Sequence, residues 1–313
     1  MSTEPLGFYH SPYLWCLFFS VVLWIAFYEM GITELNAYMD DSWGVRNPVD
    51  MVSFKGHIIP LNQAKFLELF DFLNIPWNWK KQVFGAKLDV IGFNIDCEKI
   101  IIALPNDECL ALVQALRTFL IPRSQPLVAW QRITGWANWA INMFPLGRWS
   151  IQSSWDKIAG KTLRNAQVPR NKMVLEDLSW LADSLKSWPG RIILNTDTMF
   201  WNLELADLTF FVDSCPTGIG IWCPKLHKTW SQVLPPPSRE IYWAELWAVV
   251  SAITIAAEKS AKRVVVFLDN KVVCGFFSSH RPIDSVRLLF RNAINIMLTK
   301  NVDVKGTEFF KNH

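Results

Sequence analysis

Two adjacent carboxylates, Asp40 and Asp41, follow Tyr38 and Met39 near the start of the sequence. Apolar residues flank the pair, and this pattern favours a tight hairpin turn that presents negative charge at an edge of the protein. Carboxylates held together on a rigid hairpin are the hard oxygen ligands that divalent metal ions require. Aspartate is also common in turns that have no chemical task. The pattern therefore predicts a turn, and a metal site and a plain turn remain equal alternatives.

Three further acidic residues stand in apolar surroundings. Asp213 and Asp269 each follow a strand-like, mostly apolar run, and Glu245 is the one charged residue in the middle of an apolar helical stretch. A carboxylate in so apolar a helix is costly unless it is paired or bound to a metal ion. Acids at the ends of two buried strands, with one more from a packed helix, can converge on one point as magnesium ligands. Either aspartate alone is explained as a strand-end residue, but the three together favour a metal cluster.

A basic stretch lies in the middle of the chain. Residues 146–172 carry six Lys and Arg against one acidic residue, Asp156, and Trp149 and Trp155 stand among them. Cations interleaved with aromatic rings can follow a phosphate backbone. A solvated helix face explains the same pattern. The basic residues are Arg148, Lys157, Lys161, Arg164, Arg170 and Lys172.

The elements that must position these residues fall into three blocks, divided by turn signals and changes in composition. In residues 1–104 we expect a helix over residues 61–73 and short strands over 83–84 and 90–95. Residues 105–190 are expected to be helical, with helices over 109–120, 128–143 and 174–185.

The third block, residues 191–313, alternates strand and helix patterns. The expected order β-β-β-α-β-α indicates a mixed sheet with helices on its faces. The whole chain is therefore expected to be a multidomain protein of the α+β or α/β class. Strands are expected over 208–213, 218–223, 227–233 and 263–268, and helices over 239–259, 270–277 and 286–298.

Composition bounds these alternatives. The 313 residues suggest two or three domains, and 51% apolar with 19% charged residues excludes wholesale disorder. The net charge of +3 is too small to indicate nucleic acid or membrane by itself. The six cysteines contain no C-x-x-C pair, which disfavours zinc ribbons and disulfide scaffolds. We expect free cysteines buried as small apolar residues, and a reducing location, cytoplasmic or nuclear rather than secreted.

An uncharged, aromatic-rich run covers residues 13–28. It is shorter than the roughly 20 residues that a bilayer span needs. No Lys or Arg precedes Arg46, so the charges that accompany signal peptides and orient membrane helices are missing there. We expect a buried core helix, with a membrane anchor as the minority alternative.

These motifs together resemble a known family. Residues 1–104 resemble the palm of reverse transcriptases, because Tyr38-Met39-Asp40-Asp41 matches the catalytic turn of that family. The segments FDFLNIPWNWKKQ and VIGFNI are similar to the two motifs that follow this turn in the family. Residues 191–313, with FVDSCPTGIGIW, EIYWAELWAV and VVVFLDN, are similar to the ribonuclease H domain of retrotransposons. Residues 105–190, including GWANWAINMFPLGRW, resemble the thumb and connecting region between them.

The resemblance implies roles for the polymerase residues. Asp40 and Asp41 would bind the catalytic metals, Tyr38 and Met39 would lie near the primer terminus and template, and Lys81 (or Lys80) would face the triphosphate. The implied cofactor is Mg²⁺ or Mn²⁺ at two-metal sites. The implied partners are a primer–template or RNA–DNA hybrid, with deoxynucleoside triphosphates if the polymerase is complete, and no membrane.

The resemblance also implies that Asp213, Glu245 and Asp269 bind two magnesium ions for hydrolysis of RNA in a hybrid. Ser214, Gly218 and Gly220 would permit close approach of the substrate backbone. Arg148, Lys161 and Arg164 are the expected contacts to its phosphates.

The sequence departs from the family at both ends. The family uses another palm aspartate on an earlier strand and a fourth ribonuclease H acid after the last strand, and no residue of this sequence matches either. We therefore expect negligible polymerisation by this chain alone and weak or no hydrolysis. The alternatives are a non-catalytic nucleic-acid-binding remnant of a retroelement and, less favoured, a membrane-anchored protein.

Overall fold

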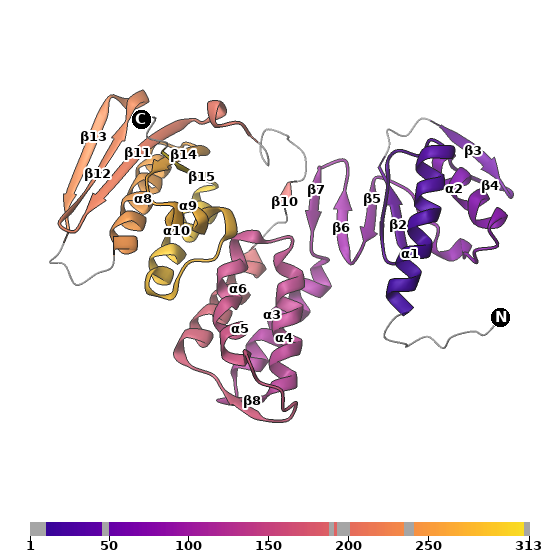
Figure 1. Ribbon diagram of the computed structural model, residues 1–313, viewed down its shortest axis with the longest axis horizontal. Coiled ribbons are helices and arrows are strands. Elements are labelled where there is room, and N and C mark those ends of the chain that lie inside the picture. The colour runs from indigo at the N-terminus through magenta and orange to yellow at the C-terminus, as the bar shows by residue number, and fades with distance from the viewer. Residues whose placement is uncertain (1–10, 46–49, 188–190, 193–200, 235–240, 310–313) are drawn as a thin grey trace. The chain divides into compact units, whose positions relative to one another are not determined.

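The computed structural model describes residues 11–45, 50–187, 191–192, 201–234 and 241–309 (Figure 1). Its contacts divide the chain into two compact units, Met1–Ile102 and Ala103–His313. The boundary lies two residues before the expected end of the first block, while the second and third blocks share one unit. The division of that unit into two domains remains a prediction.

The first unit is built from one long helix, three hairpins and a second helix. The helix α1 continues into a π-helical turn, and α2 follows β4 without a break. One side of α2 packs Phe66 and Leu69 against Phe19 of α1, and the other side packs Ala64 and Leu67 against the β3–β4 hairpin. The elements are α1 (Ser11–Trp24), β1 (Leu35–Tyr38), β2 (Asp41–Gly44), β3 (Met51–Phe54), β4 (His57–Pro60), α2 (Leu61–Phe72), β5 (Lys87–Val90), β6 (Phe93–Asp96) and β7 (Ile101–Ala103).

Two strand predictions in this unit are wrong. Val83 and Phe84 lie outside any strand and are exposed, so the short apolar pair has no neighbour to bond with. The expected strand over residues 90–95 is instead a hairpin of β5 and β6, because Ile91 and Gly92 turn the chain with φ of 51° and 75°. Gly92 adopts such an angle without steric cost.

The helix expected over residues 13–28 forms, but the prediction that it is buried is wrong. Only Phe19, Val22 and Ala26 are buried, and they lie on the side that meets α2. The segment Pro12–Glu29 is 17% buried, long enough and apolar enough to cross a membrane, as is the half-buried helix Ile241–Glu258. A run that is apolar on every side exceeds what one neighbouring helix can cover. The exposed side carries Tyr13, Leu14, Leu17, Phe18, Val21, Trp24, Phe27 and Tyr28.

The first part of the second unit is the helical segment, residues 103–187. Three of its helices begin at a proline or at a capping side chain. Pro105 precedes α3, Pro126 precedes α4, and Asn171 accepts a hydrogen bond from the Val174 amide at 2.9 Å at the start of α6. The helices expected from the sequence are present, and α5 and the small β8–β9 ladder are additional. The elements are α3 (Asn106–Leu120), β8 (Ser124–Pro126), α4 (Leu127–Ile141), a 3₁₀ segment (Pro145–Ile151), α5 (Gln152–Ile158), β9 (Gln167–Pro169) and α6 (Lys172–Ser187).

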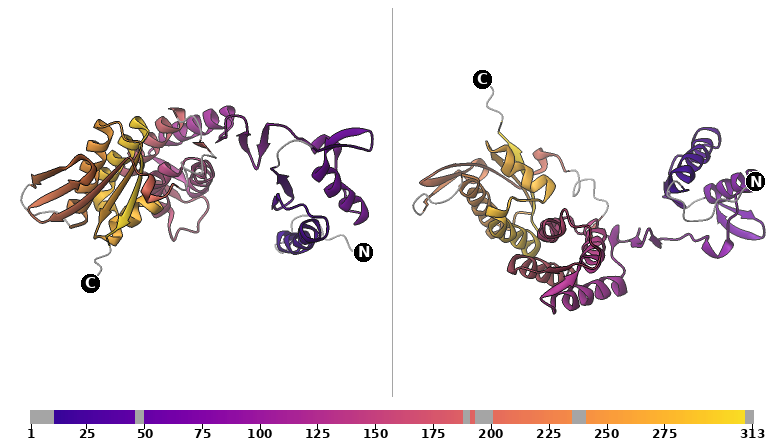
Figure 2. Two further views of the ribbon diagram at one scale, coloured as in Figure 1. Left: turned by 90° about the horizontal axis from the view of Figure 1, so that it is seen from above. Right: turned by 60° about the horizontal axis from the view of Figure 1, so that its bottom comes forward.

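The rest of the second unit is a five-stranded mixed sheet in the order β13-β12-β11-β14-β15. The first three strands are antiparallel, and β14 and β15 run parallel to β11. Figure 2 shows the sheet with its helices packed beside it. The inward side chains of the sheet and those of α8, α9 and α10 form one core. The elements are β10 (Arg191–Ile192), β11 (Leu208–Cys215), β12 (Gly218–Cys223), β13 (Lys228–Val233), α8 (Ile241–Glu258), β14 (Arg263–Leu268), α9 (Lys271–Ser279), α10 (Arg287–Lys300) and β15 (Asp303–Glu308).

The mixed sheet predicted from the β-β-β-α-β-α order is confirmed, and the strand boundaries differ by two residues at most except at β15. Strand β15 was not predicted from the sequence, because the run DVKGTE contains a single apolar residue, Val304. Its place is set by backbone pairing with β14 at the edge of the sheet. The expectation of buried cysteines is wrong for most of them, since Cys223 alone among the described cysteines is buried.

A candidate metal centre

Two of the three predicted acids lie at the same end of two neighbouring strands. Strands β11 and β14 are parallel neighbours in which Phe211 pairs with Phe267. Asp213 and Asp269 each follow two residues later, so both reach the carboxyl end of the strand pair. Both are exposed. The side-chain alternation of strands places each aspartate on the same face as the phenylalanine before it.

The third acid, Glu245, lies on a helix that packs against the sheet. Glu245 lies in the second turn of α8, which packs against β11, and only 3% of its surface is exposed. One carboxylate oxygen from each of Asp213, Glu245 and Asp269 lies within 4.8 Å of the other two. We call these three residues the acidic triad.

The charge of Glu245 is poorly compensated. Burial raises the pKa of this carboxyl, and the negative charges of Asp269 and Asp213 raise it further, against a lowering contribution from Ser214. Its Oε2 atom is buried and has no hydrogen-bond partner among the described residues. A buried carboxylate oxygen without a donor costs free energy that a bound cation would recover.

Local structure fixes the two aspartates and leaves space beside them. The Ser214 amide donates to Asp213 Oδ1 at 2.9 Å. Asn270 directly follows Asp269 and starts α9 by accepting hydrogen bonds from the Val272 and Val273 amides. Gly220 pairs with Asp213 across the β11–β12 ladder, and a Cβ added there would meet no atom within 4 Å. The surface next to Asp213 is therefore open to a substrate.

The triad fits a divalent metal ion by its chemistry. Mg²⁺ and Mn²⁺ prefer carboxylate oxygens, and two ligands of one Mg²⁺ lie at most about 4.2 Å apart, twice the metal–oxygen distance. Small side-chain adjustments from the observed spacing of up to 4.8 Å would satisfy this limit. The buried Oε2 of Glu245, which has no hydrogen-bond partner among the described residues, is a second and independent observation that fits a cluster able to hold a cation.

The polymerase-like residues lie in the other unit. Tyr38 pairs with Asp41 in the β1–β2 hairpin, and Met39 and Asp40 form its turn, with Met39 at φ 55°. The predicted turn is therefore present and exposes both carboxylates. Lys81 ends a 3₁₀ turn, Trp79–Lys81, and no described hydrogen bond or ion pair joins it to the hairpin.

The structure separates the predicted phosphate contacts into two groups. Arg148 lies in the 3₁₀ segment beyond the C-terminal end of α4, next to buried Trp149. The Val128 amide bonds to the carbonyl of Arg164 at 3.0 Å, so Arg164 lies at the N-terminal end of the same helix. Lys161 is three residues from Arg164 and is exposed. The 15 residues of α4, about 22 Å of helix, keep Arg148 away from the other two.

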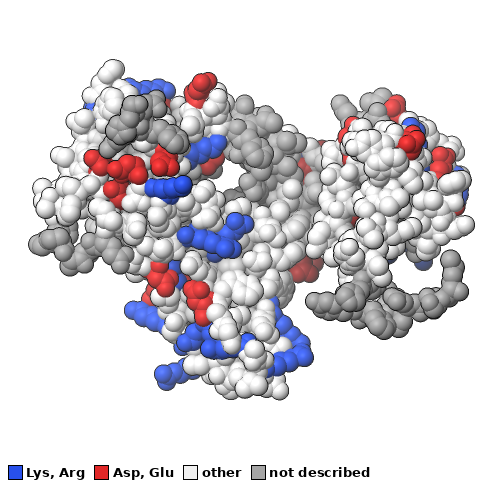
Figure 3. Space-filling model, in the orientation of Figure 1, with Lys and Arg blue, Asp and Glu red and all other residues white. Residues whose placement is uncertain are grey.

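Folding brings Arg123, which lies outside the basic stretch, next to Arg170 of that stretch. The Arg170 amide bonds to the Arg123 carbonyl at 2.9 Å beside the β8–β9 ladder. We define the cationic end of the helical segment as Arg123, Lys161, Arg164 and Arg170, and Figure 3 shows Lys and Arg gathered there near β8. Among the described residues no carboxylate lies within 4.0 Å of any of the four. Arg123 was missed because it precedes the basic stretch by more than twenty residues.

Comparisons with known proteins identify no close relative. The sequence matches no protein-family model, and it matches no curated protein. Two solved structures of foamy viral protease-reverse transcriptase in complex with double-stranded DNA are similar to this chain at 14% and 16% identity, with TM-scores of 0.42 and 0.44. They cover 99% and 100% of this chain, which spans 51% and 61% of their lengths. Similarity at this level carries no argument about the chemistry, which rests on the geometry above.

Proposed function

We propose that residues 201–309 form a metal-dependent nuclease centre that hydrolyses the RNA strand of an RNA–DNA hybrid. The observation that carries this proposal is the convergence of Asp213, Glu245 and Asp269 within 4.8 Å, with a buried, unpartnered oxygen on Glu245. The resemblance of the surrounding motifs to ribonuclease H selects RNA in a hybrid among phosphodiester substrates.

Each triad residue has a distinct part. Glu245 is held rigidly by the packed helix α8 and anchors the cluster from below. Asp213 and Asp269 are exposed and face the substrate, with Gly220 leaving space for its backbone. Bound Mg²⁺ or Mn²⁺ ions would supply activation of water and stabilisation of the leaving oxygen. The three carboxylates would hold these ions in place and neutralise part of their charge.

The cationic end of the helical segment is proposed as the second contact with the nucleic acid. Among the described residues none of its guanidinium and ammonium groups has a carboxylate partner, and Arg170 Nε donates to the Pro122 carbonyl oxygen. Cations without a carboxylate partner are suited to contact phosphates. The proposed contacts include the Lys161 and Arg164 side chains predicted from the sequence, together with Arg123 and Arg170. Arg148 lies apart and is not included.

The β1–β2 hairpin is proposed as part of a polymerase palm of retroelement origin. Asp40 and Asp41 would be its metal ligands, with Tyr38 and Met39 near a primer–template and Lys81 near a deoxynucleoside triphosphate. Two carboxylates on one turn do not clamp two metal ions about 3.5–4 Å apart without further ligands. We therefore expect no polymerisation by the chain as given.

The second candidate function is nucleic-acid binding without catalysis, favoured by the cationic end. Such binding would weaken steeply with salt and would be insensitive to EDTA. A metal-dependent nuclease would instead lose cleavage when EDTA is added.

The discriminating experiment is cleavage of an end-labelled RNA–DNA hybrid by the purified 313-residue chain with Mg²⁺ or Mn²⁺. We expect cleavage that EDTA abolishes and that Asp213→Asn reduces at least a hundredfold. Glu258→Gln, an exposed acid at the end of the same helix as Glu245, is the matched control and should cleave normally. A folded protein that binds the hybrid without cleaving it would favour the second candidate.

A further inference from the structure

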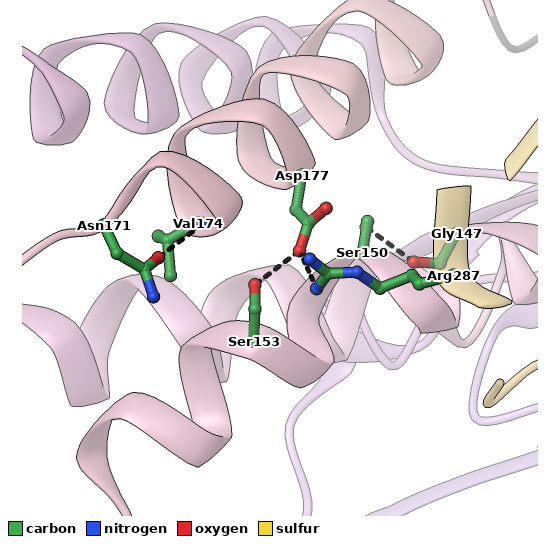
Figure 4. A network of polar contacts seen from close by, with 7 residues as sticks. All are labelled: Gly147, Ser150, Ser153, Asn171, Val174, Asp177 and Arg287. Carbon is green, nitrogen blue, oxygen red and sulfur yellow. Dashed lines mark hydrogen bonds and ion pairs between the residues drawn. The ribbon is translucent and has the colours of Figure 1, made fainter. Parts of the chain in front are cut away.

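A buried ion pair joins the helical segment to the helix layer of the sheet. Arg287, the first residue of α10, donates from Nη1 to Asp177 Oδ2 of α6 at 2.6 Å, and the two side chains are 5% and 2% exposed. Ser153 of α5 donates to the same oxygen at 2.5 Å. Figure 4 shows Asp177 between the serine and the arginine, which approach it from different elements.

A second polar contact crosses the same boundary. The indole Nε1 of Trp180, on α6, donates to Asn295 Oδ1 of α10 at 2.7 Å. Trp180 also packs against Trp149, whose ring belongs to the core of the sheet. The helical segment is therefore docked on α10 through directional contacts as well as apolar surface.

The ion pair adds little to the stability of the fold, because burying the two charges is costly. Burial raises the pKa of Asp177 to about 6 in spite of Ser153 and Arg287, so removal from water outweighs the attraction of its partners. Arg287 Nε is buried without a hydrogen-bond partner among the described residues, and so are Gln152 Oε1 and Ser154 Oγ, which flank Ser153 in α5. An interface selected for stability alone would hold apolar side chains here.

Directional pairs of this kind serve to select one arrangement among several of similar energy. Apolar surfaces alone permit sliding of α6 on α10, whereas Asp177 accepts from Arg287 in a single register. The segment that this contact fixes carries the cationic end, and the layer to which it is fixed carries Glu245.

We propose that Asp177 and Arg287 are positioning residues that hold the cationic end at one fixed distance from the acidic triad, so that a bound duplex is hydrolysed at a set number of nucleotides from its basic contact. The statement about the position of hydrolysis rests on the proposed nuclease function. The statement about the fixed distance is tested without nucleic acid.

The first test measures docking directly. Spin labels attached through p-acetylphenylalanine at Asn165, beside the cationic end, and at Ser231, on β13, report the distance between the two parts by pulsed electron resonance. The unmodified pair should give one narrow distribution. The double variant Asp177→Leu with Arg287→Met keeps the volume and removes the charges, and we expect the distribution to widen at least twofold while the unfolding midpoint in urea is retained. An unchanged narrow distribution in a folded double variant would overturn the proposal.

The second test follows the cleavage position on a hybrid labelled at one end. The original chain should cut at one dominant distance from the end, and the double variant should spread its cuts over several positions at a similar total rate. A purely structural role would lower the total rate without moving the cuts, and that result would contradict the proposal. If neither protein cleaves, the proposed function fails while the distance measurement still decides the docking.

Discussion

The indole Nε1 of Trp15 donates a 3.0 Å hydrogen bond to the carbonyl oxygen of Met39. Helix α1 is thereby fastened to the turn that presents Asp40 and Asp41, at the one residue of the turn with a positive φ. A residue with a side chain is uncommon in that conformation, and an external donor helps to hold it there.

Replacing Trp15 with Phe should therefore loosen the hairpin while keeping the ring contacts with Phe19. We expect a loss of about 1 kcal/mol, the usual net contribution of one hydrogen bond, and faster amide exchange over residues 38–41. Hydrogen exchange with mass spectrometry measures this. Trp24→Phe, an exposed position on the same helix, is the control. Equal exchange in the two variants would show that the bond does not restrain the turn.

The variant Glu245→Gln should separate the effect of this carboxylate on stability from its role in metal binding. The folded-state pKa of Glu245 is raised, so its ionised form opposes folding, and metal-free stability should increase as pH falls through that pKa toward 4.5. The variant should therefore be as stable as the original chain or more stable at pH 7 without metal. Added Mn²⁺ should raise the melting temperature of the original chain but not of the variant. A variant that is stabilised equally by Mn²⁺ would remove Glu245 from the site.

Asp177 should give stability a second pH dependence. Its pKa is about 6 in the folded chain and 3.8 for the free group, so the folded state binds the extra proton between these values and stability falls as pH rises from about 4 to about 6. The pKa difference corresponds to about 3 kcal/mol at most. The neighbouring charges that shift this pKa are Arg287, Arg291 and Glu176.

Urea unfolding of the original chain and of Asp177→Asn from pH 4.5 to pH 7 isolates this effect. Asp207 and the other carboxyls whose pKa is lowered contribute the opposite slope equally to both proteins, so the difference between them reports Asp177. A pH-independent difference would mean that Asp177 stays ionised throughout.

Gly220→Val should block the substrate without disturbing the ligands. A side chain at Gly220 would stand beside Asp213 on the open face, where a Cβ meets no other atom. We expect at least tenfold weaker hybrid cleavage with unchanged Mn²⁺ affinity. Unchanged cleavage would show that the substrate does not approach over β12.

Lys161→Ala and Arg164→Ala should each reduce the salt dependence of hybrid binding. Each lost phosphate contact lowers the slope of log K against log salt by about 1. Lys259→Ala, directly after the last residue of α8 and not a member of the cationic end, should leave the slope unchanged. Parallel salt plots for all four proteins would exclude the cationic end from the interface.

The sequence sufficed where one local signal dominates. The strand that contains Asp213, the strand that precedes Asp269 and the helix that carries Glu245 have strong apolar patterns, so the convergence of the three acids could be expected from the sequence. It did not suffice where contacts between distant residues determine the structure. Strand β15 is placed by its backbone pairing with β14. The exposure of α1 follows from how little of the first unit packs against it. Neither the approach of Arg123 to Arg170 nor the pairing of Asp177 with Arg287, 110 residues apart, leaves a local trace.

Calorimetric titration of Mn²⁺ into the metal-free chain tests most directly whether the acidic triad is a metal centre. We predict a site in the original chain that binds at least ten times more weakly, or not at all, in Asp269→Asn, and that persists in Glu258→Gln. Identical titrations for the original chain and Asp269→Asn would contradict the account.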